Sequence, residues 1–466
     1  MSGAAPLTVV VDVTDTVDTQ WRAGIQRVVC RLVAELGTDP RLDVVPVVWL
    51  ESARAFRRLT PDELARLAPD ADLAAPAGGG AAAAAAAGIP SRNRPPQADS
   101  ETEFVGGDSP GAGDSPEGGN AAVGGGARGR AVDLLRRTGL ESVARHARRR
   151  MQASTRDRHL VPLVYHPPPG SVLLEMDTVW NNLWVERAAL LAQLRDRGVH
   201  VAVLVYDLLP QRHPEWFEPT LVEVSDRTLR AQMAHAEVVF AISEHTAADL
   251  ADWNRSQGLT VPDAVVVTLG ADLPGSTGDP ASLPAELDGH DYVLVVGTVE
   301  PRKNHAVLLD AFDRWQRLGS DLHLVVIGRP GWHNDEVLAR LGSHPQAGRT
   351  LHWWQHCDDA TLAALYRSAT VVAVPSITEG FGLPVIEALS YGAPVVASNG
   401  GALPEAAAGH AELVAPDDTD GWVRALTAQR GRNSTRSVNA VSSGYRPPSW
   451  IDSAGTITDT LTGTFR

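Results

Sequence analysis

The stretch VVAVPSITEGFGLPVIEA, residues 371–388, combines a short apolar run, a glycine-containing turn and a helix start. Val371–Val374 has the β-branched, apolar character of a buried strand. Gly380 and Gly382 permit a tight turn whose backbone can approach a ligand closely. Pro384 suits the first helical position, where its missing N–H is not needed. The stretch therefore predicts a strand–loop–helix unit, whose loop follows the carboxyl end of a strand, the usual ligand position in parallel sheets.

Two glutamates, Glu379 and Glu387, have this turn between them. The free backbone amides of Phe381, Gly382 and Leu383 are expected to point at a phosphate, helped by the helix dipole. The two carboxylates can then hold opposite ends of one extended ligand. A capped surface helix with two solvated glutamates is the competing interpretation of this segment taken alone.

A second segment follows the same logic. The run GTVEPRKN, residues 297–304, follows a predicted strand at Tyr292–Val296 and precedes a predicted helix. Arg302 and Lys303 are placed to neutralise a diphosphate and to stabilise it as it leaves. Lys303 is the only lysine of the chain, although a general bias toward arginine accounts for the absence of others. Surface charge is the alternative interpretation of this basic pair.

Short apolar runs alternate with helical patterns along most of the 466 residues. This alternation predicts parallel sheets covered by helices on both faces. We expect an α/β fold with two facing, doubly wound domains joined around Gly270–Gly289. The first domain is assigned to residues 1–268 and the second to 269–446, with a tail helix at 447–466 that packs back onto the protein.

Between residues 74 and 130 the composition changes to Gly, Ala, Pro, Ser and Asp, which cannot form a packed core. This segment is predicted to be a disordered insertion in the first domain. Residues 131–158 follow it with eight arginines in a helical pattern. Two interpretations of that basic helix stay open: contact with an anionic membrane surface, or a cover for the first domain with a solvated arginine face.

Composition excludes several classes of protein. The formal net charge of −15 argues against general binding of nucleic acid, which needs a basic face. No run approaches the roughly 20 apolar residues of a membrane span, and the N-terminus lacks the features of a signal peptide. Two distant cysteines do not suggest a disulfide framework. A cytoplasmic protein, in peripheral contact with the membrane if the basic helix binds it, is the expectation.

Taken together, four segments resemble the retaining family 4 glycosyltransferases, which have two Rossmann-like domains in the GT-B architecture. The segments are VGTVEPRKN, LVVIGRPGW, LYRSATVVAVPSITEGFGLPVIEALSYGAPVVAS and GGALPEAAAGHAELVAPDD, and they cover nearly all of residues 292–416. One residue departs from the family pattern: members often carry arginine directly after the first glycine of the lysine motif, where this chain has Thr298.

The resemblance implies a role for each matching residue. Glu387 is expected to hold the ribose of the nucleotide and Glu379 the hydroxyls of the donor sugar. Arg302 or Lys303 is expected to bind the diphosphate. Backbone around the turn and the flanking loops completes the predicted donor site; these residues are Gly380, Phe381, Gly382, Leu383, Gly297, Thr298 and Gly328. Such enzymes usually need no metal and no cofactor beyond the nucleotide sugar.

The first domain resembles the family more loosely. Gly24 opens the first long helix at a turn that can face a phosphate of the acceptor or donor. Tyr206 stands where the family often has histidine, so a histidine role in positioning the sugar does not carry over. Asp207 is expected to meet the acceptor or the reacting sugar. Ser243 is expected to cap a helix.

Weaker metal signals are interpreted as structural or accidental. His352, His356 and Cys357 lack a fourth ligand at suitable spacing for zinc. Asp70-Ala71-Asp72 matches the short DxD pattern of metal-dependent glycosyltransferases, but it falls at the edge of the low-complexity segment.

The sequence thus predicts a retaining, metal-independent hexosyltransferase. Its first expected donor is GDP-mannose, with other nucleotide sugars as alternatives. The expected acceptor is a glycan or a lipid-linked intermediate in the synthesis of a surface polysaccharide or glycoconjugate. Two other interpretations stay open: a non-catalytic scaffold that binds nucleotide or glycan, and a different enzyme, either an inverting two-domain transferase or a nucleotide-sugar epimerase.

Overall fold

A computed structural model of the chain describes residues 5–19, 24–68, 157–181, 185–271, 283–429 and 445–466. Residues 1–71 and 153–466 form one compact unit, which contains both sheets of the protein. The predicted insertion at 74–130 and nearly all of the predicted basic helix at 131–158 lie outside the described residues. The following description concerns the unit that contains the sheets.

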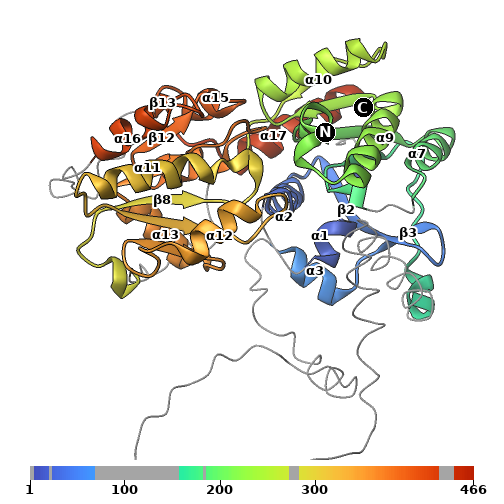
Figure 1. Cartoon of the computed structure of the whole chain (residues 1–466). Helices are drawn as coiled ribbons and strands as arrows, with labels where there is room; N and C mark the ends of the chain where they lie inside the picture. Colours follow the sequence, from blue (N-terminus) through green and yellow to red (C-terminus); the bar gives the residue numbers. More distant parts are fainter. Residues whose placement is uncertain (1–4, 20–23, 69–156, 182–184, 272–282, 430–444) are drawn as a thin grey trace, which may run out of the picture. The chain divides into compact units, whose positions relative to one another are not determined.

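The first sheet has seven strands in the order β3-β2-β1-β4-β5-β6-β7 (Figure 1). All neighbours pair in parallel except β3, which runs antiparallel to β2 at the edge. The strands are β1 (Leu7–Asp12), β2 (Leu42–Leu50), β3 (Ala55–Arg58), β4 (Val172–Glu175), β5 (His200–Val205), β6 (Val238–Ala241) and β7 (Val265–Val266).

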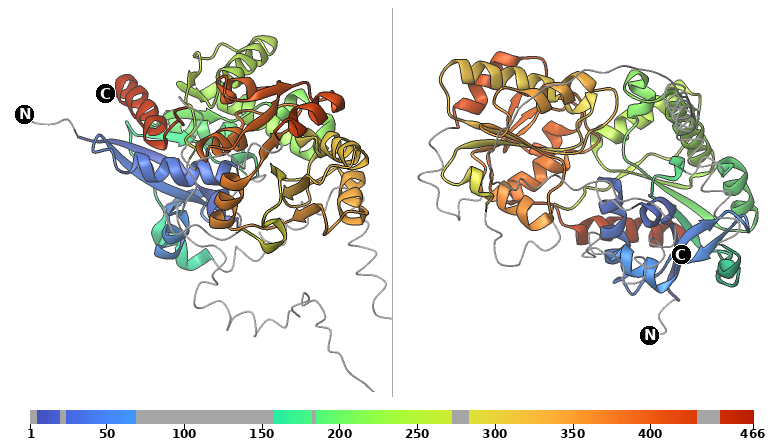
Figure 2. Two further views of the ribbon diagram at one scale, coloured as in Figure 1. Left: turned by 90° about the vertical axis from the view of Figure 1, so that its left-hand side faces the viewer. Right: turned by 60° about the horizontal axis from the view of Figure 1, so that its bottom comes forward.

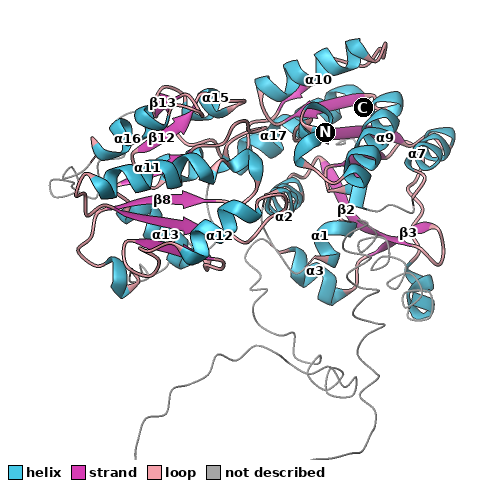
Figure 3. Cartoon of the chain, viewed as in Figure 1, coloured by secondary structure: helices cyan, strands magenta, loops and turns pink. Residues whose placement is uncertain are grey.

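The second sheet has six strands, all parallel, in the order β10-β9-β8-β11-β12-β13. They are β8 (Tyr292–Val296), β9 (His323–Ile327), β10 (Leu351–Trp354), β11 (Val371–Val374), β12 (Val395–Ser398) and β13 (Glu412–Val414). Figure 3 shows both groups of strands among helices. The predicted fold class, an α/β chain with two doubly wound parallel sheets, is confirmed.

Helices connect the strands, as expected for parallel pairs, which need a crossover. In the first half they are α1 (Thr14–Asp18), α2 (Ile25–Leu36), α3 (Pro61–Leu67), α7 (Arg187–Asp196), α8 (Leu209–Arg212), α9 (Pro219–His235) and α10 (Glu244–Ser256). In the second half they are α11 (His305–Arg317), α12 (Asp335–Ser343), α13 (Asp359–Ser368), α14 (Leu383–Ser390), α15 (Leu403–Ala407), α16 (Thr419–Thr427) and α17 (Trp450–Phe465).

Alternate residues of β8 show why its sequence is apolar throughout. Val293 and Val295 pack into a core with α11, α12 and α16, whereas Tyr292 and Leu294 pack into another with α13 and α14. Figure 1 shows α11 and α13 on opposite sides of β8. Because both faces of the strand are buried, no polar position alternates with the apolar ones.

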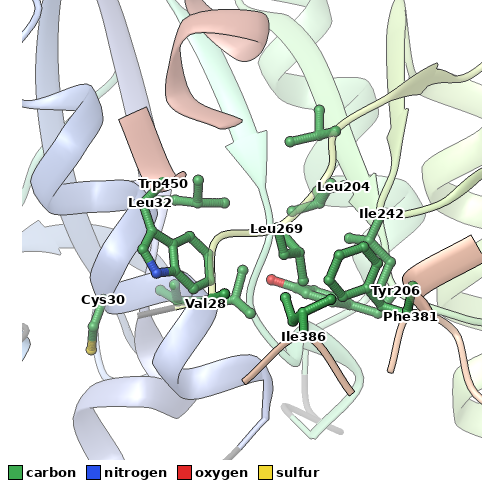
Figure 4. Close-up of a cluster of buried hydrophobic side chains, with 14 of the residues drawn as sticks. Val28, Cys30, Leu32, Leu204, Tyr206, Ile242, Leu269, Phe381, Ile386 and Trp450 are labelled. Carbon is green, nitrogen blue, oxygen red and sulfur yellow. The ribbon is translucent and has the colours of Figure 1, made fainter. Parts of the chain in front are cut away.

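The C-terminal helix α17 packs on residues of the first half. Ile457 and Leu461 are fully buried, and the Ser453 hydroxyl donates to the carbonyl oxygen of Thr268 at 2.5 Å. Both views of Figure 2 show this red helix beside the blue N-terminal segment, where it contacts α2. In Figure 4, Trp450 lies next to Val28 of α2. Gly270 leaves room for that indole, because a Cβ there would come within 2.5 Å of the Trp450 ring.

Among the helices of the described ranges, none is both long and apolar enough to cross a bilayer. Strands β3 and β7 and several short helices, such as α3 and α15, were not predicted. They are too short to show a period of hydrophobic residues. The sequence pattern of residues 181–197 predicts a helix from Asn181 to Arg197, but α7 begins only at Arg187, after a short 3-10 turn at Val179–Asn181.

Candidate functional site

Both sheets reverse their strand order at the centre, and this reversal locates the site. In the second sheet β8 lies between β9 and β11, so the chain leaves β8 toward one edge and later returns at β11 toward the other. The connections that follow β8 and β11 therefore diverge and leave a crevice at the carboxyl ends of these strands. The loop after β8 carries Arg302 and Lys303, and the loop after β11 carries Glu379.

Glu379 is the centre of a charged cluster in this crevice. Lys303 Nζ lies 2.5 Å from its Oε1, and Arg302 Nη1 lies 2.6 Å from its Oε2. The Ser376 hydroxyl also donates to Oε1, at 2.6 Å. Burial alone would raise the pKa of this carboxyl, but Arg302 and Lys303 lower it to about 2. Glu379 therefore stays ionised and rigidly oriented at neutral pH.

Arg302 forms ion pairs with two acidic side chains and acts electrostatically on a third. Its Nε lies 2.7 Å from the Glu300 carboxylate, while its Nη1 bonds Glu379. Burial raises the pKa of Asp207, and the nearby Arg302 guanidinium opposes that shift. The structure thus brings together the predicted residues Glu379, Arg302, Lys303 and Asp207.

At the predicted turn glycine Gly380, the second half of the chain packs directly against the first. A Cβ at this position would lie 2.2 Å from the carbonyl oxygen of Tyr206, so only glycine allows the contact. The Gly380 carbonyl accepts hydrogen bonds from the hydroxyls of Ser243, at 2.6 Å, and Thr246, at 3.0 Å. Ser243 also caps α10 through a bond from the Thr246 amide. The Ser243 side chain therefore caps α10 and also bonds the Gly380 turn of the second half.

Glu387 lies one turn into α14 and is 5 % exposed. Arg27 Nη1 of α2 lies 2.6 Å from its Oε1, and the Tyr366 hydroxyl donates to its Oε2 at 2.9 Å. Burial raises the pKa of Glu387, whereas Arg27, Tyr366 and Lys303 oppose the rise. Lys303 thus pairs directly with Glu379 and also lowers the pKa of Glu387 electrostatically.

Backbone geometry accounts for the remaining donor-site candidates. Gly382 precedes α14 with a φ of 104°, and the Phe381 side chain is buried in the core, so these two residues and half-buried Leu383 offer backbone amides rather than side chains. Figure 4 shows Phe381 beside Tyr206. A Cβ on Gly328 would meet the Gly297 carbonyl oxygen at 1.9 Å, so the loops after β8 and β9 lie against each other.

For two of the predicted site residues, Thr298 and Gly24, the structure shows no hydrogen bond with the charged cluster among the described residues. Thr298 is half-buried in the loop after β8, and within the described residues its side chain makes no hydrogen bond to the charged cluster. Gly24 immediately precedes α2 with a φ of 54°, and a Cβ there would meet no atom of the described residues within 4 Å. Open space beside Gly24 is compatible with the predicted phosphate-facing turn.

A cavity of about 230 Å³ adjoins the charged cluster. Asp207, Glu300 and Arg302 line it together with Asp177 and several aromatic side chains. Burial raises the pKa of Asp177 to about 7, and the carboxylate of Asp15 adds to this rise. The sequence alone assigned no role to Asp177. The strand order shows why it lies near the site: Asp177 follows β4, next to the strand-order reversal of the first sheet.

Sequence reasoning also missed Arg27, Tyr366, Ser376 and Glu300. Arg27 and Tyr366 bond Glu387 from 360 and 21 positions away in the chain, which no local pattern encodes. Ser376 and Glu300 are close in sequence to their partners Glu379 and Arg302, and their place in the two predicted loops was the signal that could have found them. Of the residues in the weak metal signals, His352 faces His323 at 3.2 Å, and burial raises the pKa of Cys357 to about 12. Asp70-Ala71-Asp72 lies outside the described residues. Within the described ranges no three His, Cys, Asp or Glu side chains gather as metal ligands would.

Comparisons with known proteins match the second half of the chain to glycosyltransferases. Residues 284–428 match the family model "Glycosyl transferases group 1". The "Serotype-specific mannosyltransferase WbdA" of Escherichia coli is 34 % identical over 226 residues, which are 46 % of this chain and 28 % of that protein. The "O-antigen chain mannosyltransferase B" of Escherichia coli is 32 % identical over 222 residues, 44 % of this chain and 55 % of that one. The chain therefore matches between about a quarter and a half of the length of these curated relatives.

A solved structure extends the likeness to both halves. The crystal structure of Anabaena Alr3699/HepE in complex with UDP and glucose aligns over 98 % of this chain and 100 % of that chain, with a TM-score of 0.54 and 14 % identity. Such a likeness concerns the fold, and the two doubly wound sheets are accordingly those of the GT-B architecture. The match to the family model "Glycosyl transferases group 1" covers residues 284–428, which contain the second sheet and the charged cluster around Glu379.

Proposed function

We propose that the chain is a retaining glycosyltransferase that moves a hexosyl group from a nucleoside diphosphate sugar to a hydroxyl of a glycan or lipid-linked acceptor. The observation that carries this proposal is the ionised Glu379 carboxylate, held by Lys303 and Arg302 at the strand-order reversal of the second sheet. The family match and the two mannosyltransferase relatives favour a mannosyl group, with GDP-mannose as the first donor to test.

The cluster has the groups that a diphosphate sugar requires. A carboxylate accepts hydrogen bonds from sugar hydroxyls, and two cations beside it can contact the diphosphate. Glu387, 5 % exposed and bonded to Arg27, is assigned to the ribose hydroxyls. The amides at the start of α14 add a partial positive charge near the donor.

In the proposed reaction a lone pair of the acceptor hydroxyl oxygen forms the new bond to the anomeric carbon. The bond from that carbon to the phosphate oxygen breaks, and its electron pair leaves with the nucleoside diphosphate. A phosphate oxygen takes the acceptor proton on the same face, which retains the anomeric configuration. Lys303 and Arg302 stabilise the negative charge that grows on the diphosphate, so we expect transfer to persist in the presence of a chelator.

A transfer assay tests this proposal. The wild type is incubated with GDP-mannose and UDP-glucose and a neutral oligosaccharide, and NMR reads the anomeric configuration of the product. Lys303→Ala and Glu379→Gln should each lower kcat/KM by roughly 10²–10³-fold, because each removes charge stabilisation or sugar contact in a buried site. Arg255→Ala, which removes an exposed ion pair with Asp252, is the control and should leave kcat/KM unchanged.

The outcomes separate the alternatives. An inverted product would contradict the retaining mechanism while keeping the transferase. Binding of a nucleotide sugar without transfer to any acceptor would favour a non-catalytic scaffold.

A further inference from the structure

The cavity next to the charged cluster has a lining that discriminates between kinds of acceptor. Its volume of about 230 Å³ is below the roughly 300–1,000 Å³ of sites for drug-sized ligands. It therefore suits a ligand the size of one ring. Both halves of the chain contribute: Asp177, Trp180, Asp207 and Phe217 from the first, Glu300 and Trp332 from the second.

Aromatic side chains form part of its wall. The rings of Phe217 and Trp332 lie with their centroids 6.1 Å apart and tilted by 41°. Trp332 Nε1 donates to the carbonyl oxygen of Trp216 at 2.7 Å, which fixes the indole while 40 % of the residue stays exposed. Trp180 is half-buried and lines the same cavity. Such rings offer broad apolar faces, on which the C–H groups of a pyranose can pack.

Acidic side chains predominate in the lining, and burial raises the pKa of each of them, that of Asp177 to about 7. Asp177, Asp207 and Glu300 are three carboxyl groups, whereas Arg302 is the single cation that lines the cavity. The Arg302 guanidinium is already bonded to Glu300 and Glu379. A phosphate group on the acceptor would add up to two negative charges beside these carboxyls, and like charges at close range are unfavourable.

Polar groups suited to neutral hydroxyls are also present. Gln211 and Ser225 line the cavity and bond each other at 2.9 Å through the amide and the hydroxyl. Amides and hydroxyls both donate and accept hydrogen bonds, so they can pair with sugar hydroxyls in either sense. The Asp207 carboxylate can accept a further bond from a hydroxyl.

We propose that this cavity binds a neutral sugar ring as the acceptor unit, stacked on Trp332 and Trp180, and disfavours phosphorylated sugars and polyols. This inference rests on the proposed glycosyl transfer and specifies its acceptor. It separates the chain from glycosyltransferases whose acceptor carries a phosphate next to the reacting ring.

The test uses matched pairs of ligands. Full-length protein labelled with 5-fluorotryptophan is saturated with GDP or UDP, whichever binds, and titrated with neutral hexoses and with their 6-phosphates while ¹⁹F NMR is recorded. Trp332→Phe and Trp180→Phe assign the two resonances. Neutral hexoses should shift both resonances, and each 6-phosphate should bind at least about tenfold more weakly because of repulsion by the carboxyls.

Variants test the stacking independently. Trp332→Ala should weaken binding of neutral hexoses by up to about tenfold, as expected for the loss of one aromatic contact. Trp332→Phe should retain most of the affinity. Trp49→Phe changes a half-buried indole bonded to Glu51, outside the cavity lining, and is the matched control. Affinity for the nucleoside diphosphate should be the same in all three variants.

Tighter binding of a 6-phosphate than of its hexose would overturn the inference. Equal hexose affinity of Trp332→Ala and Trp49→Phe would overturn it as well. Failure of the wild type to bind any nucleoside diphosphate would instead count against the proposed function, so the two failures are distinguishable.

Discussion

Arg27, in the first half of the chain, forms an ion pair with Glu387 in the second half. Its guanidinium lies 2.6 Å from Oε1, and Tyr366 occupies Oε2. Carboxylate oxygens have further lone pairs, so these bonds orient Glu387 and leave it able to accept from ribose hydroxyls. Burial raises the pKa of Glu387, and Arg27 holds that pKa below the level that burial alone would give.

Arg27→Met should therefore weaken nucleotide binding by about tenfold near pH 7, since losing the cation raises the pKa of Glu387 further. The affinity should recover as the pH is raised and Glu387 ionises, and Arg27→Lys should retain most of it. Isothermal titration calorimetry with GDP and UDP between pH 6 and 9 measures both effects. Tighter binding by Arg27→Met would identify the ion pair as a competitor of the nucleotide and contradict this role.

The burial of His305 predicts that acid lowers the free energy of unfolding. This histidine is 3 % exposed, and neither ring nitrogen has a hydrogen-bond partner among the described residues. Burial, with a contribution from Lys303, lowers its pKa to about 3. Below pH 6.5 the unfolded chain binds a proton that the folded chain does not, so stability falls with pH until about pH 3.

This group alone should cost about 2 kcal/mol of unfolding free energy between pH 7 and pH 5. Asp177 acts in the opposite direction, because its raised pKa makes the folded state bind a proton over the same window. Urea unfolding of wild type and His305→Leu at pH 7 and pH 5 separates the two groups. The variant should lose less stability, or gain more, than the wild type on acidification, and an identical change in both proteins would refute the assignment.

Among the structural elements, the turn before α14 depends on the absence of a side chain at Gly380. A methyl group there would lie 2.2 Å from the Tyr206 carbonyl oxygen, so Gly380→Ala must push this turn away from the first half. We expect a loss of about 1–3 kcal/mol in stability and a fall in transfer rate, because Glu379 and Asp207 separate. Gly342→Ala, in α12 with nothing within 4 Å of the added Cβ, should stabilise the protein by about 0.5–1 kcal/mol.

Thermal and urea unfolding, together with a transfer assay, compare these glycine variants. If Gly380→Ala keeps both stability and activity, the close contact with Tyr206 is not required in solution.

The C-terminal helix α17 gives a second comparison of matched positions. Ile457 is fully buried, whereas Ile451 in the same helix is 69 % exposed. Ile457→Ala should cost about 2–5 kcal/mol through lost burial and the cavity left behind, and Ile451→Ala should stay within about 0.5 kcal/mol of wild type. Urea unfolding measures both changes. Similar effects of the two substitutions would mean that α17 does not pack as described.

Local sequence was sufficient for many elements of the fold. Strand β8 has the predicted bounds and helix α14 follows the predicted glycine turn, because an unbroken apolar run and a Gly-x-Pro start are strong local signals. Strand β3 was missed, since it is a short antiparallel edge strand stabilised by β2 rather than by its own pattern. The start of the helix predicted at Asn181 was set too early, because the apolar pattern continues through the preceding turn.

The candidate site was predictable where one segment carries it. Glu379 and Lys303 lie in loops that follow strands, and the topology brings those loops to one crevice. The roles of Arg27 and Trp332 could not be predicted from the sequence. Each residue bonds a partner in the other half of the chain, and no local pattern encodes such a pairing. The charge of the cavity likewise depends on residues from three separate segments, the loops that follow β4, β5 and β8.

For the molecule as a whole, we propose that the crevice at the β8/β11 reversal binds a nucleoside diphosphate sugar through Lys303 and Glu387. The most direct measurement is titration calorimetry of the wild type, Lys303→Ala, Glu387→Ala and the control Arg255→Ala with GDP-mannose and UDP-glucose. We predict that wild type and Arg255→Ala bind one donor with the same affinity, and that each site variant binds it at least about tenfold more weakly. Absence of binding by folded wild type, or equal affinity of all four proteins, would contradict the account.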